Sequence, residues 1–436
     1  MTPKPQSWGI VGGGFLGMTL ALRLRAQGHT VTLLEAGERL GGLATPWTIG
    51  DITWDRHYHV ILLSDSHLRA LLAELGLAEE LRWSVTRTGF YTDGQYYSMS
   101  SPLEFLRFPP LNLIEKFRLG LTILYASRVR DWKPLERVRV AEWLERLSGP
   151  GTTRKIWLPL LRAKLGDSYT RTSAAFIWTT INRMYAARRS GLKQEMFGYV
   201  QGGYARILDR FAERLRERGV KVILKAPTHR VGAAPTGAVE VIHSGDCRDV
   251  FDRVVITAPA VVAARLCPEL SADETLRLQA IEYVGIVCAS VLLRRPLTPY
   301  YVTNITEPWV PFTAVIEMSA LVDPAQLGGH ALVYLPKYAS PGDPIFARPD
   351  AEIETEFLGA LYRMHPSLTP ADVLAFKISR VPHVFALPTL GYSDALPPTT
   401  MSIPGVHIIN SAHIVNGTLN VNETVQLAER MMATLL

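Results

Sequence analysis

Cysteine is scarce in this chain of 436 residues, which contains only Cys247, Cys267 and Cys288. These three are widely spaced and no C-x-x-C pair occurs, so the sequence offers neither a zinc-binding pattern nor a redox disulfide. We therefore predict no metal site. A low cysteine count is typical of proteins kept in a reducing compartment, and we predict a cytoplasmic location.

Long apolar runs are also missing. No stretch of about 18 apolar residues occurs, so hydropathy predicts no transmembrane helix. The N-terminal residues MTPKPQ lead straight into a short apolar segment, so we expect no signal peptide. Internal repeats and low-complexity tracts are absent as well.

Basic residues do not cluster, although the formal net charge is +6. The arginines are scattered through amphipathic segments and form no long basic run, so we expect no nucleic-acid partner. A membrane surface or an anionic small molecule fits this charge balance better. The sequence gives no indication of the oligomeric state.

The most informative pattern that is present lies in residues 7–45. Two short apolar segments, Ser7–Val11 and Thr30–Leu34, are predicted to be buried parallel strands. Phe15–Gln27 is predicted to be the helix between them, and Gly28 is a plausible end for it. Strand, turn, helix and strand therefore follow one another in the order of a nucleotide-binding βαβ unit.

Three glycines in the first turn fit the spacing G-x-G-x-x-G. Gly12 permits a tight turn, Gly14 lets a diphosphate approach the backbone, and Gly17 lets helix and strand pack closely. The N–H groups of the first helical turn would face that diphosphate. At the end of the second strand, the carboxylate of Glu35 can accept hydrogen bonds from ribose hydroxyls. An acid at this position disfavours a 2′-phosphate, so the dinucleotide is FAD or NAD and not NADP.

A second glycine pair extends the fingerprint, because Glu35 is followed by AGERLGG. This region resembles the flavin amine oxidase superfamily, which includes monoamine and polyamine oxidases, protoporphyrinogen oxidase and the phytoene desaturases. The resemblance covers nearly the whole chain, and residues 65–120 are similar to a bacterial protoporphyrinogen-oxidase-like branch. It implies that the cofactor is FAD and that Arg39, Gly41 and Gly42 lie along it.

The same resemblance implies further cofactor contacts. The segment near Thr228–Val231, just after a predicted strand, would carry a backbone contact to adenine, and the N-terminus of the last helix would face the flavin. Relatives usually carry Gly-Asp or Gly-Glu where this chain has Asn410-Ser411, so the side chain that meets the cofactor there stays open. The predicted cofactor-binding residues are Gly12, Gly14, Phe15, Gly17, Glu35, Ala36, Arg39, Gly41, Gly42, Leu43, Arg230, Val231, Asn410, Ser411, Asn420 and Val421.

We predict an α/β fold with two domains. Residues 1–80, 197–264 and 401–436 would form a Rossmann-type FAD-binding domain, and residues 81–196 and 265–400 an α+β substrate domain. The first insert is expected to be helical, and the second to mix strands with proline-rich loops.

Within the FAD-binding pieces, the apolar residues of one segment follow helical spacing. They are Ile207, Leu208, Phe211 and Leu215, and the helix is expected to end at Gly219. Val220–Leu224 is predicted to be a strand, and Ala238–His243 and Val250–Thr257 a β-ribbon. Asn420 or Asn422 is predicted to cap the C-terminal helix, with Glu423 in its first turn.

Candidate catalytic residues follow the second glycine pair. Arg56, His57, Tyr58 and His59 are consecutive, and the resemblance implies that this segment passes close to flavin and substrate. One of His57 or His59 would orient substrate or relay a proton. The alternative is that both are structural hydrogen-bonding residues where two domains meet. Lys337 is the residue that the resemblance suggests for the lysine near flavin N5 in some amine oxidases. The alternative, which the unspecific pattern around it favours, is an ordinary surface lysine.

Two further segments have the pattern of helices. A helix is predicted after Ser64, Asp65 or Ser66, one of which would cap it. Residues 103–130 mix Leu, Phe and Ile with Arg and Lys, which is compatible with a helix in a membrane interface. The alternative is a helix packed inside the insert domain.

The predicted function is FAD-dependent oxidoreduction, in which a bulky, partly apolar small-molecule substrate gives a hydride to flavin N5. One alternative is a flavin-dependent isomerase resembling UDP-galactopyranose mutase, which acts without net redox change. The other is a non-catalytic FAD-binding protein. We further expect a peripheral contact with the inner face of the membrane.

Overall fold

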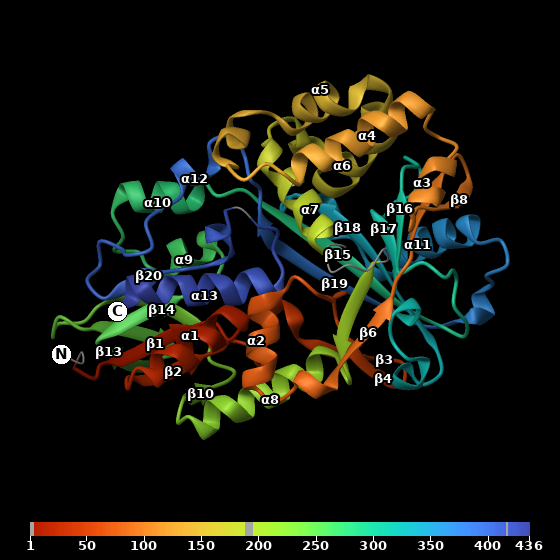
Figure 1. The fold of residues 1–436 in the computed structure, drawn as a ribbon. Helices are drawn as coiled ribbons and strands as arrows, with labels where there is room; N and C mark the ends of the chain where they lie inside the picture. Colours follow the sequence, from red (N-terminus) through yellow and green to blue (C-terminus); the bar gives the residue numbers. More distant parts are fainter. Residues whose placement is uncertain (1–3, 188–194, 416) are drawn as a thin grey trace.

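A five-stranded parallel sheet forms one end of the molecule in the computed structural model, which describes residues 4–187, 195–415 and 417–436 (Figure 1). Its strands, in spatial order, are β10 (Lys221–Ile223), β2 (Thr30–Leu34), β1 (Ser7–Val11), β14 (Arg253–Ile256) and β20 (Val406–Ile408). Three parts of the sequence that lie far apart therefore supply one sheet. The two strands predicted around the glycine turn, β1 and β2, lie side by side in it.

Different elements pack on the two faces of this sheet. Trp8, Ile10 and Leu33 pack on one face against α1 (Phe15–Ala26), α8 (Gly203–Glu217) and α13 (Val421–Leu435). The other face carries α9 (Ala260–Leu266) and an antiparallel ribbon of β11 (Thr228–Ala233), β12 (Val239–His243) and β13 (Cys247–Phe251). The predicted β-ribbon is present, but Val250–Thr257 does not belong to it as a whole, because the chain passes at Asp252 from β13 into β14 of the parallel sheet.

A second, mostly antiparallel sheet has seven strands. In spatial order they are β19 (Val373–Ala386), β15 (Tyr283–Leu293), β18 (Ala331–Ala339), β17 (Ala314–Glu317), β16 (Val302–Ile305), β7 (Thr88–Thr92) and β8 (Gln95–Ser98). Helix α11 (Asp350–Met364) covers one face through Ile353, Phe357 and Leu361. On the other face, Cys288, Tyr334 and Tyr338 join a core that also contains apolar residues of the helical segment 140–187. The domain boundaries drawn from the sequence stay a prediction.

The sequence predicts a helical first insert, but the structure shows that this insert also contains strands. Beside β7 and β8 it contributes β6 (Leu81–Val85), which pairs with β9 (Met196–Val200) next to β5 (Ile61–Leu62). Its helices are α3 (Pro102–Arg107), α4 (Leu113–Ala126), α5 (Val140–Thr152), α6 (Leu158–Leu165) and α7 (Ala174–Ala187). Residues 103–130 form two helices, because Pro109 and Pro110 interrupt the pattern between α3 and α4. Within the described ranges, no helix is both long and apolar enough to cross a membrane.

The remaining elements connect these layers. They are the hairpin β3 (Pro46–Ile49) and β4 (Ile52–Asp55), and the helices α2 (Ser66–Glu74), α10 (Ala272–Gln279) and α12 (Tyr392–Ala395).

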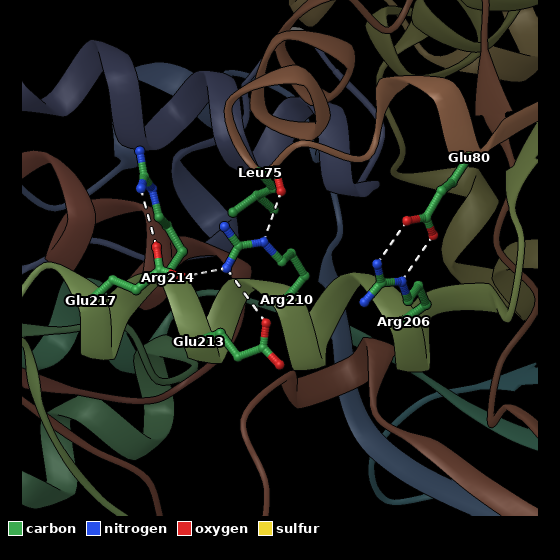
Figure 2. A network of polar contacts seen from close by, with 7 residues as sticks. All are labelled: Leu75, Glu80, Arg206, Arg210, Glu213, Arg214 and Glu217. Carbon is green, nitrogen blue, oxygen red and sulfur yellow. Dashed lines mark hydrogen bonds and ion pairs between the residues drawn. The ribbon is translucent and has the colours of Figure 1, made fainter.

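Arginines on the outer face of α8 hold it to the segment after α2. Arg206 binds both carboxylate oxygens of Glu80, at 2.8 and 2.7 Å, and Arg210 Nε donates to the Leu75 carbonyl at 3.0 Å (Figure 2). The opposite face of α8 buries Ile207, Leu208 and Phe211, as its helical spacing predicts. Much of the arginine excess of this helix therefore serves local ion pairs.

Helix α2 receives its N-terminal cap from a distant part of the chain. Asp65 occupies the cap position, but its carboxylate accepts the Leu62 N–H at 2.9 Å and makes no cap bond. The N–H groups of His67 and Leu68 instead donate to Asn422 Oδ1, at 3.0 and 3.1 Å. The prediction that Ser64, Asp65 or Ser66 caps this helix is thus wrong, because the acceptor is the side chain of Asn422.

Replacing Asn422 by alanine is expected to destabilise the protein by about 1–2 kcal/mol, because two buried helix N–H groups lose their acceptor. Urea unfolding of Asn422→Ala measures this loss. Ser66→Ala, an exposed change in the first turn of the same helix, is the control and should stay within about 0.5 kcal/mol of wild type. Equal losses in both variants would contradict the cap.

Candidate cofactor and active site

The turn after β1 leaves the first turn of α1 open. Gly12 has φ +113° and donates its N–H to the Leu34 carbonyl at 2.9 Å. A Cβ on Gly17 would lie 2.0 Å from the Gly12 carbonyl oxygen, so only glycine allows this helix to approach the turn. No side chain caps α1, and its first turn contains no acid. Its free N–H groups are therefore available to an anion.

The second glycine pair lies directly against this turn. The N–H of Gly41 donates to the Gly13 carbonyl at 2.8 Å, and Gly14 and Gly41 form a parallel β-bridge. A Cβ on Gly14 would meet nothing within 4 Å, whereas one on Gly42 would lie 3.3 Å from the Gly14 Cα. Two glycine segments that are separated in sequence thus form one open backbone cradle.

Glu35 closes one side of this cradle. Its Oε2 accepts the Gly13 N–H and its Oε1 accepts the Gly37 N–H, each at 2.7 Å. The chain after β10 runs beside it, since the Ala226 N–H donates to the Glu35 carbonyl at 2.9 Å. The carboxylate therefore sits where β2 ends and the segment leading to β11 passes.

Arg56 is a cation beside the cradle that sequence reasoning did not assign to the cofactor. It donates from a terminal nitrogen to the Gly42 carbonyl at 3.1 Å, while its buried Nε has no hydrogen-bond partner. No carboxylate within the described part of the chain forms an ion pair with it. Burial lowers the pKa of this guanidinium. A half-buried cation without an acid fits an anionic group in the cradle.

His57 and His59 do not face the same way, because Arg56–Val60 is not an extended strand. His57 lies between the two sheets: Nδ1 is 3.1 Å from the Leu43 carbonyl and Nε2 is 3.0 Å from Ser379 Oγ on β19. Burial lowers the pKa of His57 to about 4. These contacts match the alternative in which His57 is a structural residue where the two sheets meet.

His59 lies on the other side of this segment, above the ring of Tyr204. The ring centroids are 4.7 Å apart, and His59 Nδ1 lies 3.8 Å from Asp55 Oδ2. Burial lowers the pKa of His59 to about 3 and raises that of Asp55 to about 7. Asp55 Oδ1 accepts the Tyr204 N–H at 2.8 Å, so this group also anchors the start of α8.

Tyr58 points toward the seven-stranded sheet, where a partly buried lysine lies over the ring of its hydrogen-bond partner. Its hydroxyl is 2.6 Å from the hydroxyl of Tyr338 on β18. Lys164 Nζ, from α6, lies 3.5 Å from the centroid of the Tyr338 ring and 5.5 Å from that of Phe385. Phe176 of α7 stacks on Phe385 with 6.4 Å between centroids. Tyr58, Lys164, Phe176 and Phe385 all keep some exposed surface.

Lys164 has no ion pair or hydrogen bond to any described residue. Burial lowers the pKa of its amine to about 7. The same cause raises the pKa of Tyr58 to about 12. An amine that exchanges a proton near neutrality, next to two phenols and two phenyl rings, can bind or deprotonate a polar group on an apolar substrate.

Comparison with known families identifies the architecture around these groups. The family described as flavin containing amine oxidoreductase matches residues 17–425. The chain belongs to this family. Its membership makes the dinucleotide FAD, as the second glycine pair had implied.

Individual members of this family and of its fold are distant. Coproporphyrinogen III oxidase of Mycobacterium leprae is 27% identical over 288 residues, which cover 61% of this chain and 62% of that protein. The chain thus spans less than two thirds of this curated relative. A candidate protoporphyrinogen oxidase structure from Exiguobacterium has a TM-score of 0.77 at 19% identity, with 99% of both chains covered. Reduced UDP-galactopyranose mutase has a TM-score of 0.76 at 15% identity, covering 100% of this chain and 95% of that one.

FAD fits the residues present in this member of the family. The open face of Gly14 and the uncapped α1 suit a diphosphate, and Arg56 supplies a cation beside it. Phe15 and Val231 are buried in the cores beneath these segments, whereas Ala36 is exposed next to Glu35. No cluster of three or more metal-ligating side chains occurs among the residues described.

Three predicted residues of this family member, Lys337, Arg39 and Arg230, have their own surroundings or partners in the protein. Lys337 is on the opposite face of the seven-stranded sheet from Tyr338, in a pocket with Arg348 and Glu356. Alternation along β18 sends the two neighbours to opposite faces, so Lys337 does not share the sheet face of the Tyr58–Tyr338 pair. Arg39 forms an exposed ion pair with Asp209 at 3.0 Å, and Arg230 forms one with Glu269.

At the C-terminal end, most predicted side chains are already committed. Asn410 is buried, accepts the Ala412 N–H and donates to the Ala258 carbonyl, both at 3.0 Å. Asn420 caps α13 by accepting the Glu423 N–H at 3.0 Å, which confirms one of the two predicted caps. Ser411 is partly exposed and Val421 is buried. Asn410 and Asn420 therefore have little side-chain capacity left for a cofactor.

Proposed function

We propose that this chain is an FAD-dependent oxidoreductase that takes a hydride from a bulky, partly apolar small-molecule substrate. Residues 1–80, 197–264 and 401–436 would form its FAD-binding domain, and residues 81–196 and 265–400 its substrate domain. The observation that carries the proposal is the contact between the two glycine segments at the open N-terminus of α1, in a member of a flavin-containing family.

In this proposal the cradle of Gly12, Gly14, Gly41 and Gly42 holds the diphosphate, and Arg56 neutralises charge on the cofactor. Bound FAD would supply the two-electron acceptor. Glu35 would turn from the glycine N–H groups to the ribose hydroxyls.

The Tyr58–Tyr338 pair and Lys164 would bind the polar part of the substrate, while Phe176 and Phe385 contact its apolar part. Because the pKa of Lys164 is lowered to about 7, the amine can take up a proton at Nζ near neutral pH. His57 would position Leu43 and thereby the second glycine pair. His59 would support the start of α8 beside Asp55.

Anaerobic reduction of the purified holoprotein tests this function. The names of relatives define the panel: coproporphyrinogen III, 15-cis-phytoene and monoamines. We expect one substrate class to bleach the flavin absorbance, and an added acceptor to restore it. A yellow protein that no compound reduces would support the non-catalytic alternative. Conversion of UDP-galactopyranose by the reduced protein without net acceptor consumption would favour the isomerase.

The proposed location is the cytoplasm, with a peripheral contact at the inner face of the membrane. The low cysteine count and the absence of a long apolar run motivate this location. Several exposed apolar side chains on α3 and α4 support the contact.

A further inference from the structure

Lys164 is partly withdrawn from water but has no acid beside it. It lies on α6, which packs over β18 (Figure 1), and its Nζ is 3.5 Å from the centroid of the Tyr338 ring. No acidic side chain among the described residues pairs with this amine, and burial alone lowers its pKa to about 7. A lysine is seldom withdrawn from water unless an anion pairs with it. The described part of the chain provides no such anion, which leaves this role to a ligand.

The aromatic rings around Lys164 are not free to hold a cationic ligand. Lys164 Nζ itself occupies one face of the Tyr338 ring. It also lies 5.5 Å from the centroid of Phe385, on which Phe176 stacks with 6.4 Å between centroids and 12° between planes. An ammonium group binds to the face of an aromatic ring or to a carboxylate. A cationic ligand would therefore meet the lysine amine where it needs a ring face or an acid.

The tyrosine pair next to Lys164 has a hydrogen left to donate. The hydroxyls of Tyr58 and Tyr338 are 2.6 Å apart, and their bond uses one of the two phenol hydrogens. The other hydrogen has no acceptor among the described residues. Burial raises the pKa of both phenols, so both stay protonated at neutral pH. The site thus offers a spare phenol hydrogen and an amine, which are the groups that an anionic oxygen accepts from.

We propose that the substrate carries a carboxylate, which Lys164 binds as an ammonium ion together with the free hydroxyl of the Tyr58–Tyr338 pair. This inference rests on the proposed function, because it names the class of substrate for the same site. Phe176 and Phe385 contact the apolar part beside that carboxylate. On binding, Nζ takes up one proton from solvent, since an ion pair with a carboxylate stabilises the charged form of the amine. Acidic substrates are therefore favoured over monoamines and over hydrocarbons.

Three compounds with the same apolar part test this charge preference without any turnover. They are 4-phenylbutyrate, 4-phenylbutan-1-ol and 4-phenylbutylamine, titrated into the FAD-loaded full chain at pH 7 and followed by calorimetry and flavin difference spectra. We expect the acid to bind roughly tenfold more tightly than the alcohol, and the amine to bind most weakly. Between pH 7 and pH 9, binding of the acid should weaken by about tenfold or more, because the free amine loses its proton over this range.

Two variants of Lys164 separate its charge from its packing. Lys164→Met should lose both the preference for the acid and its pH dependence. Lys164→Arg should keep the preference and lose the pH dependence, because a guanidinium stays charged. Lys377→Met is the matched control, since the Lys377 amine also lies over an aromatic ring, 4.8 Å from the centroid of Trp47, but is exposed. It should bind all three compounds like wild type, and flavin absorbance and melting temperature of every variant show that the fold is retained.

Several results would overturn the inference of an acidic substrate. They are a wild type that binds none of the three compounds or binds them equally, tightest binding of the amine, and a preference for the acid that survives in Lys164→Met. Failure of the proposed function gives a different result, in which no compound reduces the flavin whatever the binding preference. Reduction by a monoamine at the same rate in wild type and Lys164→Met would uphold the proposed function and overturn the acidic substrate.

Discussion

Replacing Lys164 by methionine is expected to stabilise the protein at pH 7 by about 2–4 kcal/mol, although it removes a contact with Tyr338. The reason is that burial lowers the pKa of Lys164 from 10.5 to about 7. An amine that would be fully protonated in water is thus partly desolvated in the folded protein, and this lowers the free energy of unfolding. Its contact with the Tyr338 ring contributes only about 0.5–2 kcal/mol in return. Methionine fills similar space without a charge to desolvate.

The sign of the pH dependence follows from the same shift. Between pH 7 and pH 10.5 the unfolded chain keeps the Lys164 proton and the folded protein does not, so wild type gains stability as pH rises. The advantage of Lys164→Met should therefore shrink by up to about 2.7 kcal/mol between pH 7 and pH 9.

Urea unfolding at both pH values measures the effect, with Lys337→Met on the opposite sheet face as the control. The lowered pKa of Lys164 would be refuted if Lys164→Met were less stable than wild type at pH 7. It would also be refuted if the difference in free energy of unfolding between the two proteins were the same at both pH values. If Lys164 acts on the substrate as proposed, the same variant should also slow flavin reduction. Higher stability together with slower reduction would show that Lys164 is kept for function at a cost in stability.

Gly14→Ala is expected to weaken FAD binding roughly 100-fold, about 2.7 kcal/mol, while the apoprotein stays within about 1 kcal/mol of wild type. Gly14 has φ −74°, which alanine adopts, and its Cβ would meet no protein atom within 4 Å. The added methyl group would instead project into the space where the diphosphate approaches the backbone.

Gly17→Ala provides the contrast. Its Cβ would lie 2.0 Å from the Gly12 carbonyl oxygen, so the helix and turn must separate and both folding and FAD binding should suffer. Flavin content after purification, FAD titration and urea unfolding distinguish the two variants. Full FAD affinity in Gly14→Ala would place the diphosphate elsewhere.

Lys337 and Lys164 differ in how much of their surroundings the local sequence indicates. The family resemblance points to Lys337, but strand alternation turns this residue toward α11. Lys164 sits in α6 with no recognisable motif around it. Only the packing of α6 against β18 brings its amine over Tyr338 and removes part of it from water.

The sequence by itself determined the glycine turn, its flanking strands and helix, the acid at the end of β2, and the buried face of α8. These features are set within about 30 residues by backbone geometry and by the period of apolar side chains. The tertiary structure alone decided which polar groups meet: Asn422 with the start of α2, His57 with Ser379, and Lys164 with Tyr338. Such pairs join residues far apart in the chain, so no local pattern encodes them. Burial, which also depends on the tertiary structure, sets the pKa values of His57 and Lys164.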